Sequence, residues 1–218
     1  MLHRFALALL SCFSLLIAIP AQAQQLTDVI VKTELGDITI ALETERAPVT
    51  AGNFLRYVDG KRFDGTVFYR AMRLDWGDQP NGLVQGGVQN DPKRLFPPIA
   101  HEPTSVTGVK HGLGAISMAR LEPGSATADF SIMLAPQPFL DANPEGATED
   151  ERLGYAAFGH VVSGMEVVRA IFDAPVDPAK GEGWMKGQML AKPVRILTVR
   201  RAPKPAPAPA PAPVATAP

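Results

Sequence analysis

The chain has 218 residues, of which 46% are hydrophobic and 20% charged, and its formal net charge is −1 at pH 7. This length and balance are sufficient for one globular domain with a hydrophobic core. A near-neutral chain lacks the basic excess that nucleic acids and acidic membrane surfaces attract, so we expect no nucleic-acid partner. The single cysteine, Cys12, excludes an internal disulfide.

Residues 1–23 have the pattern of a secretory signal peptide. Arg4 supplies a positive charge near the start, and residues 5–19 form an almost unbroken apolar run that a proline ends. Residues 21–23 read Ala-Gln-Ala, the small-x-small pattern of a signal-peptidase site, so we expect cleavage after Ala23.

The alternatives to cleavage are weaker. The apolar run is shorter than the roughly 20 residues that span a bilayer, which argues against an uncleaved anchor. A lipoprotein modified at Cys12 would have too short an apolar run before that cysteine. The chain after Ala23 holds no cysteine, which suits an oxidising compartment. We therefore expect a mature protein in a Gram-negative periplasm or a similar extracytoplasmic space, with no stable membrane insertion.

Residues 24–201 predict one domain rich in short strands. Apolar periodicity and the positions of Gly and Pro predict, in chain order, strands at 28–33 and 37–42, a helix at 45–57, strands at 66–72, 83–88, 114–118, 130–134 and 156–162, a helix at 164–172 and a last strand at 194–200. The first helix is expected to turn Val49, Phe54, Leu55 and Val58 inward. Many short strands with two helices far apart in sequence indicate a closed β-structure whose ends the helices cover.

Residues 202–218 are almost entirely Pro and Ala. These residues lack the side chains needed for a core, and the prolines favour an extended polyproline II path. We expect a disordered, solvated tail. The alternative is a spacer or docking segment for a partner in the cell envelope.

Five blocks of sequence resemble, in order, the cyclophilin-type peptidyl-prolyl cis/trans isomerases. The blocks are Ala47–Phe54; Val67–Arg70 with Gln85–Gly87; Gly114–Arg120; Ser125–Phe130; and Phe139–Asp141 with Tyr155–Met165. Together they cover almost all of residues 27–200, and the likeness is strongest to bacterial periplasmic members.

The resemblance implies a mainly β fold, a closed eight-stranded antiparallel β-barrel capped by two α-helices. It implies an isomerase that acts on X-Pro bonds of unfolded or extended polypeptides and so assists protein folding. It implies no cofactor and no metal.

Arg70 is the catalytic residue that the resemblance implies. The X-Pro amide resists rotation with a barrier of about 18–20 kcal/mol, and no bond is made or broken, so a catalyst must favour the twisted state. In that state the prolyl nitrogen gains a lone pair, to which a fixed guanidinium can donate a hydrogen bond. Arginine suits this role because it stays charged and presents a rigid fork of donors.

The family also implies a groove for the peptide. Gln85, whose amide both donates and accepts hydrogen bonds, is expected to hold the peptide backbone and to orient Arg70. The other substrate-binding positions that the resemblance implies are Leu83, Ala119, Arg120, Asp129, Phe130, Ser131, Phe139, Leu140 and Tyr155. An apolar recess among them would explain selectivity for proline.

Some positions depart from the family pattern. Gly82 and Ser131 stand where the family carries aromatic rings of the proline pocket, and their loss is expected to weaken proline binding. The stretch between Arg70 and Gln85 is longer than in the family. We expect Trp76 from this stretch, or failing it Leu74 or Met72, to fold back as a substitute wall.

A second group of departures changes the polarity of the groove. Tyr69 replaces a histidine and keeps a ring with a polar tip. Asp129 replaces a glutamine, with Arg70 and Arg120 as candidate ion-pair partners. The acidic stretch 142–153 is expected to be a solvated loop.

Two other functions stay open at this point. Gly82 and Ser131 favour a cyclophilin-like binding module or chaperone with weak or no isomerase activity, whereas Arg70 and Gln85 oppose it. A hydrolase or metalloenzyme is disfavoured, because the three histidines left after signal cleavage are not spaced as a metal pair and no Gly-x-Ser-x-Gly elbow is present. Those histidines are His101, His111 and His160.

Overall fold

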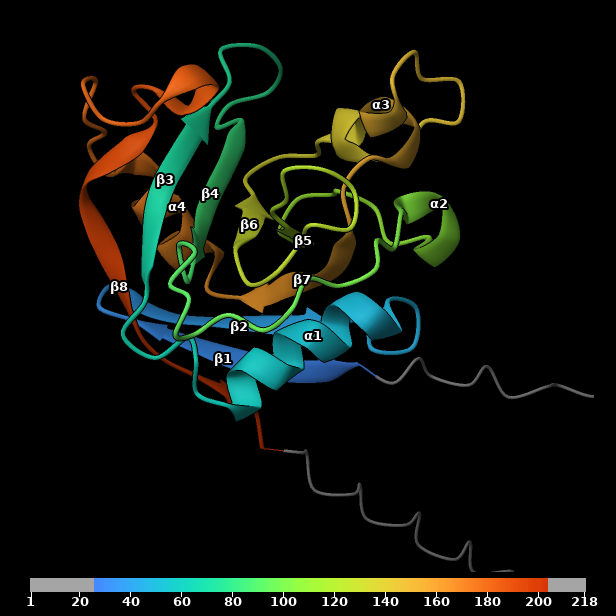
Figure 1. Ribbon diagram of the computed structural model, residues 1–218. Helices are drawn as coiled ribbons and strands as arrows, with labels where there is room; N and C mark the ends of the chain where they lie inside the picture. The colour runs from blue at the N-terminus through green and yellow to red at the C-terminus, as the bar shows by residue number, and fades with distance from the viewer. Residues whose placement is uncertain (1–25, 204–218) are drawn as a thin grey trace, which may run out of the picture.

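Eight antiparallel strands close into a barrel in the computed structural model, which describes residues 26–203 (Figure 1). The strands follow the order β1-β2-β7-β5-β6-β4-β3-β8 around the barrel, so the first and last strands of the chain pair with each other. They are β1 (Thr27–Thr33), β2 (Gly36–Leu42), β3 (Val67–Arg73), β4 (Gly82–Gly87), β5 (Ala115–Met118), β6 (Phe130–Met133), β7 (Ala157–Ser163) and β8 (Met189–Arg201). The expected barrel is confirmed.

The predicted signal peptide and nearly all of the Pro/Ala tail lie outside the described residues, so those assignments stay predictions. Within residues 26–203, no helix is long and apolar enough to cross a membrane.

The two predicted helices are present as α1 (Pro48–Asp59) and α4 (Met165–Asp173), and both pack on the barrel. The inner face of α1 carries Ala51, Phe54, Leu55 and Val58, which recur at the three- and four-residue spacing of one helix face. Val49 was expected on that face and is 42% exposed instead. The reason is geometric: Val49 precedes Ala51 by two positions, which places it about 200° around the helix.

Four short helical elements were not predicted: α2 (Thr104–Thr107), η1 (Pro138–Leu140), α3 (Glu149–Leu153) and η2 (Gly183–Met185). Helix α3 forms inside the acidic stretch that was expected to be a loop. The Thr148 hydroxyl accepts from the Glu151 amide at 3.1 Å, and the Glu151 carboxylate accepts from the Thr148 amide at 3.3 Å. This capping box satisfies the first turn of a helix too short to persist without it.

The strands on one side of the barrel have two buried faces. Inward side chains such as Val84, Ile116 and Ile132 belong to the main core, whereas Leu83 and Met133 belong to a separate apolar cluster on the outer face. Successive strand residues point to opposite faces, which explains this division. The outer face carries most of the predicted site residues.

Candidate active site

A row of polar side chains crosses the outer face of the barrel. The strand register joins four of them from one strand to the next, in the order Arg70, Gln85, Ser131 and Ser117. We call these four residues the polar row. Each is at most 9% exposed, so the row is largely shielded from solvent although it lies outside the barrel.

A row of apolar side chains runs beside the polar row, two residues further along the strands. The register sets Met72 opposite Leu83 and Leu83 opposite Met133, and Ala115 completes the cluster. We call these four residues the apolar row. The two rows share one face because strand residues two positions apart point the same way. Leu140, a predicted site residue, packs against the apolar row.

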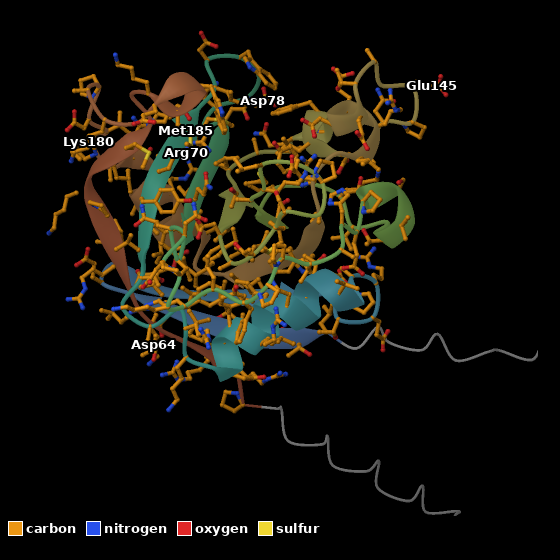
Figure 2. All side chains as sticks on the ribbon, viewed as in Figure 1. Asp64, Arg70, Asp78, Glu145, Lys180 and Met185 are labelled. Carbon is orange, nitrogen blue, oxygen red and sulfur yellow. The ribbon has the colours of Figure 1, made fainter. Side chains whose placement is uncertain are left out.

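Arg70 lies at the end of the barrel where Met185 and Asp78 are found, opposite to the end that holds Asp64 (Figure 2). Its Nη1 donates to Gln85 Oε1 at 2.6 Å, which confirms the expected contact between these two residues. Its Nε and Nη2 both donate to Gln188 Oε1, at 2.9 and 2.6 Å. Burial lowers the pKa of Arg70 to about 10, so the guanidinium stays protonated at neutral pH.

Gln188 and Trp184 are site residues that the sequence analysis missed. The Arg70 guanidinium carbon lies 4.5 Å from the centre of the Trp184 ring, a cation–π distance. Both residues come from the stretch between α4 and β8. A signal was present there, because Gly181, Gly183 and Gly187 fall within seven residues and all adopt positive φ angles.

The other end of the polar row is tied to a buried histidine. His111 lies 2.8 Å from the Ser117 hydroxyl through Nε2 and 2.7 Å from Asp141 Oδ1 through Nδ1. Desolvation lowers the pKa of His111, so a neutral ring that donates from Nδ1 fits these partners. The order Ser-His-Asp resembles a hydrolytic triad, but Ser117 is 1% exposed and gives a substrate carbonyl no access.

Gly82 cannot carry a side chain in this fold. Its φ is +137°, and a Cβ atom there would lie 1.9 Å from the Met72 carbonyl oxygen. The absent aromatic ring is therefore a consequence of close backbone approach between β3 and β4. The ring that the longer β3–β4 loop supplies is Trp76, which packs edge-on against Phe139 with centroids 5.7 Å apart. Both rings are 51% exposed, so they form an open rim rather than a closed wall.

Asp129 pairs with neither of the arginines considered for it. Its Oδ2 accepts from the Tyr69 hydroxyl at 2.8 Å, and its Oδ1 accepts from the amides of Val88 and Gln89 at 2.6 and 2.9 Å. Burial raises the pKa of the Asp129 carboxyl and also raises that of the Tyr69 hydroxyl. The reason is the β3 bulge between Phe68 and Arg70, which directs Tyr69 toward β6.

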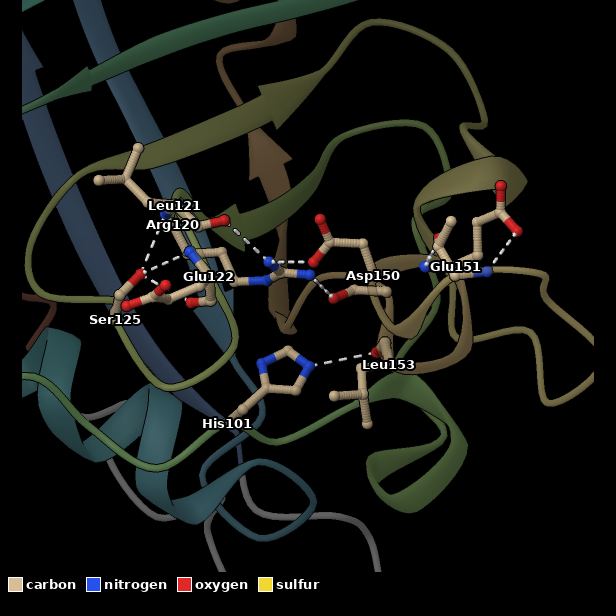
Figure 3. Close-up of polar contacts among 10 residues, drawn as sticks. His101, Arg120, Leu121, Glu122, Ser125, Asp150, Glu151 and Leu153 are labelled. Carbon is tan, nitrogen blue, oxygen red and sulfur yellow. Dashed lines mark hydrogen bonds and ion pairs between the residues drawn. The ribbon is translucent and has the colours of Figure 1, made fainter.

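Arg120 faces away from the peptide groove and ties down the segment around α3 (Figure 3). Its Nη1 donates to Asp150 Oδ1 at 2.9 Å, and its Nη2 donates to the Gly154 carbonyl at 2.7 Å. The guanidinium also covers the Tyr155 ring at 4.4 Å, and the Arg120 side chain is only 1% exposed. Arg120 is therefore a correction to the expected peptide contacts, because its donors are directed to the chain itself.

Phe130 is a second correction. It is fully buried and packs edge-to-face against Phe54, Phe63 and Phe68 inside the barrel. Strand alternation is the reason: Ser131 occupies the outward position of β6, so its neighbour must point inward. Ala119 lies just beyond β5, where its amide donates to the Asp129 carbonyl at 2.8 Å.

Among residues 26–203, no group of three or more His, Cys, Asp or Glu side chains lies close enough together to hold a metal ion.

Comparisons with known proteins agree with this architecture. The family described as "Cyclophilin type peptidyl-prolyl cis-trans isomerase/CLD" matches residues 28–201. A peptidyl-prolyl cis-trans isomerase of Acinetobacter baylyi is 35% identical, over 84% of this chain and 89% of its own length. Peptidyl-prolyl cis-trans isomerase A of Dickeya dadantii is 37% identical, over 78% of this chain and 85% of its own length.

The fold also has a solved counterpart. A crystal structure of a cyclophilin-type isomerase from Cryptosporidium parvum matches with a TM-score of 0.63, covering 83% of this chain and all of that one, at 19% identity. At this identity the likeness supports the fold, whereas the family match and the bacterial relatives establish the kinship. This chain belongs to the cyclophilin-type peptidyl-prolyl cis-trans isomerase family.

Proposed function

We propose that this chain accelerates cis/trans isomerisation of X-Pro bonds in unfolded or extended polypeptides. The observation that carries the proposal is the fixed, buried guanidinium of Arg70 beside the apolar row. Family membership supports the same reaction. The C. parvum protein is also described in the presence of the dipeptide Ala-Pro, the smallest X-Pro unit.

The two rows divide the work. The apolar row and Leu140 receive the proline ring, since burial of apolar surface favours a ring over polar side chains. Gln85 already accepts from Arg70 with its oxygen, so its amide nitrogen is the end that can hold the peptide backbone. Trp76 and Phe139 flank the bound peptide at the rim.

Arg70 acts on the reacting bond itself. When the amide twists, conjugation is lost and the prolyl nitrogen becomes a hydrogen-bond acceptor. A guanidinium that is already oriented stabilises this twisted state without reorganising, whereas neither planar ground state offers it the same acceptor. No nucleophile, proton transfer or covalent intermediate is needed.

The direct test is an isomerisation assay on a short X-Pro peptide, with the mature chain from Gln24 and its Arg70→Ala variant. We expect clear acceleration by the parent protein and a loss of about 100-fold or more in the variant, with unchanged circular dichroism. A well-folded parent protein without acceleration would contradict the proposal.

The second candidate is a cyclophilin-like module that binds peptides or acts as a chaperone with little turnover. The observation that favours it is Ser131, whose hydroxyl occupies the middle of the polar row where the family carries a ring. In the same experiment this candidate is supported if the parent protein binds the peptide, measured by calorimetry, but does not accelerate its isomerisation.

We further propose that the protein assists folding in the periplasm and that residues 202–218 form a docking segment or spacer for an envelope partner. The support is the signal-peptide pattern of residues 1–23 and the absence of cysteine after Ala23. Fractionation of cells that produce the full chain tests the location. Recovery of an uncleaved chain from the cytoplasm would contradict it.

A further inference from the structure

The stretch between α4 and β8, residues 174–188, is anchored beside Arg70 by its own backbone. Val176 bridges to Leu190, and the Asp177 amide donates to the Met189 carbonyl at 2.8 Å. A further bond from the Gly187 amide to the Lys180 carbonyl, at 2.8 Å, closes the stretch into a loop. We call these residues the α4–β8 segment.

Gln188 ends this segment and is held on both sides. Its backbone carbonyl accepts from the Ala71 amide at 2.9 Å, directly after Arg70 in β3. Its side-chain Oε1 accepts twice from Arg70, and its Nε2 donates to the Trp184 carbonyl at 2.9 Å. A guanidinium can only donate and a carbonyl can only accept, so one orientation of the amide alone satisfies both partners.

Trp184 covers one face of the same guanidinium. The ring lies over Arg70 and is 69% exposed, so its other face is open to solvent or to a bound peptide. The turn that brings it there depends on Gly181, because a Cβ atom at that position would lie 2.5 Å from the Met185 carbonyl oxygen. The tight backbone of the segment therefore exists in a form that delivers Trp184 and Gln188 to Arg70.

The donors of Arg70 show what these contacts achieve. A guanidinium has five N–H bonds, and the contacts to Gln85 and Gln188 use three of them. The remaining two belong to the terminal nitrogens. With the Trp184 ring against one face and two amides in its plane, the guanidinium can neither rotate nor tilt freely.

We propose that Gln188 and Trp184 are positioning residues for Arg70, which orient its two remaining N–H donors toward the twisted X-Pro bond. This inference rests on the proposed function, because it concerns the same reaction. Removal of the Gln188 amide should lower kcat about 10- to 100-fold and leave KM within about twofold, since misplacement of a catalytic donor affects the twisted state and not peptide binding.

The variants for the test are matched in shape. Gln188→Met keeps the length of the side chain and removes the amide, whereas Gln188→Glu keeps an oxygen acceptor for Arg70 and should restore most of the turnover. Trp184→Ala removes the ring, and Trp184→Phe keeps an aromatic face. Lys186→Ala is the control, because Lys186 is an exposed residue of the same segment.

Two readouts are needed on the mature chain from Gln24. The first is kcat and KM for a short X-Pro peptide. The second is the NMR signal of the Arg70 Nε–H, assigned by its disappearance in Arg70→Lys, which reports whether the guanidinium is held regardless of turnover. We expect Gln188→Met to lower kcat and to shift the Nε–H signal and speed its exchange with water, with no such change in Lys186→Ala.

The outcomes separate this inference from the proposed function. Unchanged kcat and an unchanged Nε–H signal in Gln188→Met would overturn the positioning role while leaving the isomerase intact. Equal losses in Gln188→Met and Lys186→Ala would also overturn it, because the effect would then belong to the segment as a whole. If the parent protein lacks turnover, the proposed function fails, and the Nε–H signal still decides whether Gln188 positions Arg70.

Discussion

The polar row and the apolar row lie side by side on the same strands, yet their side chains are held in different ways. Arg70 is fixed by directional hydrogen bonds from two glutamines, and Ser117 by one with His111. Met72, Leu83 and Met133 are held by contact with one another and with Leu140. Direction matters where one donor must meet one atom in a twisted bond, whereas a pocket for a proline ring needs only area and shape.

The largest expected effect comes from replacing the fork and keeping the charge. Arg70→Lys should lower kcat/KM by about 100-fold, because an ammonium on a flexible stem cannot hold the orientation that a planar guanidinium holds. Steady-state or NMR exchange assays on an X-Pro peptide measure this. Near-parental turnover in the lysine variant would show that charge alone suffices, and the distinction between the rows would lose its basis.

Asp129 tests the support of the polar row beside the bulge. Asp129→Ala leaves the Tyr69 hydroxyl and the amides of Val88 and Gln89 without their acceptor, so the free energy of unfolding should fall by about 2–3 kcal/mol. Asp129→Asn keeps an acceptor oxygen and should lose less than half as much. Urea titration of both variants measures the difference, and equal losses would contradict the hydrogen-bond account.

Leu83 tests the apolar row. Leu83→Ala removes apolar surface that meets the proline ring in the planar and the twisted states alike, so it should raise KM about 5- to 30-fold and leave kcat nearly unchanged. Leu121→Ala is the control, because Leu121 is 89% exposed. A fall in kcat with constant KM would mean that Leu83 belongs functionally with Arg70.

Trp76 tests the rim of the groove. Its edge-on contact with Phe139 is worth about 0.5–1.5 kcal/mol, so Trp76→Ala should lower kcat/KM by about 2- to 10-fold. Trp76→Phe keeps a ring and should retain most of the activity. Turnover in Trp76→Ala that matches the parent protein would remove Trp76 as the substitute for the missing aromatic rings.

The smallest effect is expected from pH. The pKa of Arg70 is lowered to about 10, so the protonated donor is present throughout the neutral range and is lost only as the pH rises through that value. Turnover of a peptide without ionisable groups should therefore be flat from about pH 6 to pH 8.5 and fall near pH 10. A decline between pH 6 and pH 8 would point to a different titrating group.

Much of the fold was predictable from local pattern. The alternation of apolar residues at 28–33 and 37–42 predicted the hairpin formed by β1 and β2, and the apolar periodicity of 164–172 predicted α4. Motif blocks around Arg70 and Gln85 predicted that these two residues meet, and they do. Local patterns work here because strand and helix periodicity repeat within a few residues.

The same reasoning misplaced side chains wherever the outcome depended on a distant partner. Whether Phe130 or Ser131 faces the groove depends on the register of β6 against β4, and the structure turns Phe130 inward. Arg120 was expected to meet the peptide, but Asp150 and the Gly154 carbonyl, on a segment far along the chain, take its donors.

By itself, the sequence determined the barrel class, the catalytic candidate Arg70 and the family kinship, because these depend on short-range pattern and motif order. Only the tertiary structure decided that Gln188 and Trp184 hold Arg70. These residues lie more than a hundred positions away in the chain, and closure of the barrel through β8 brings them together. No local periodicity encodes such a contact, since it arises from strand pairing around the whole barrel.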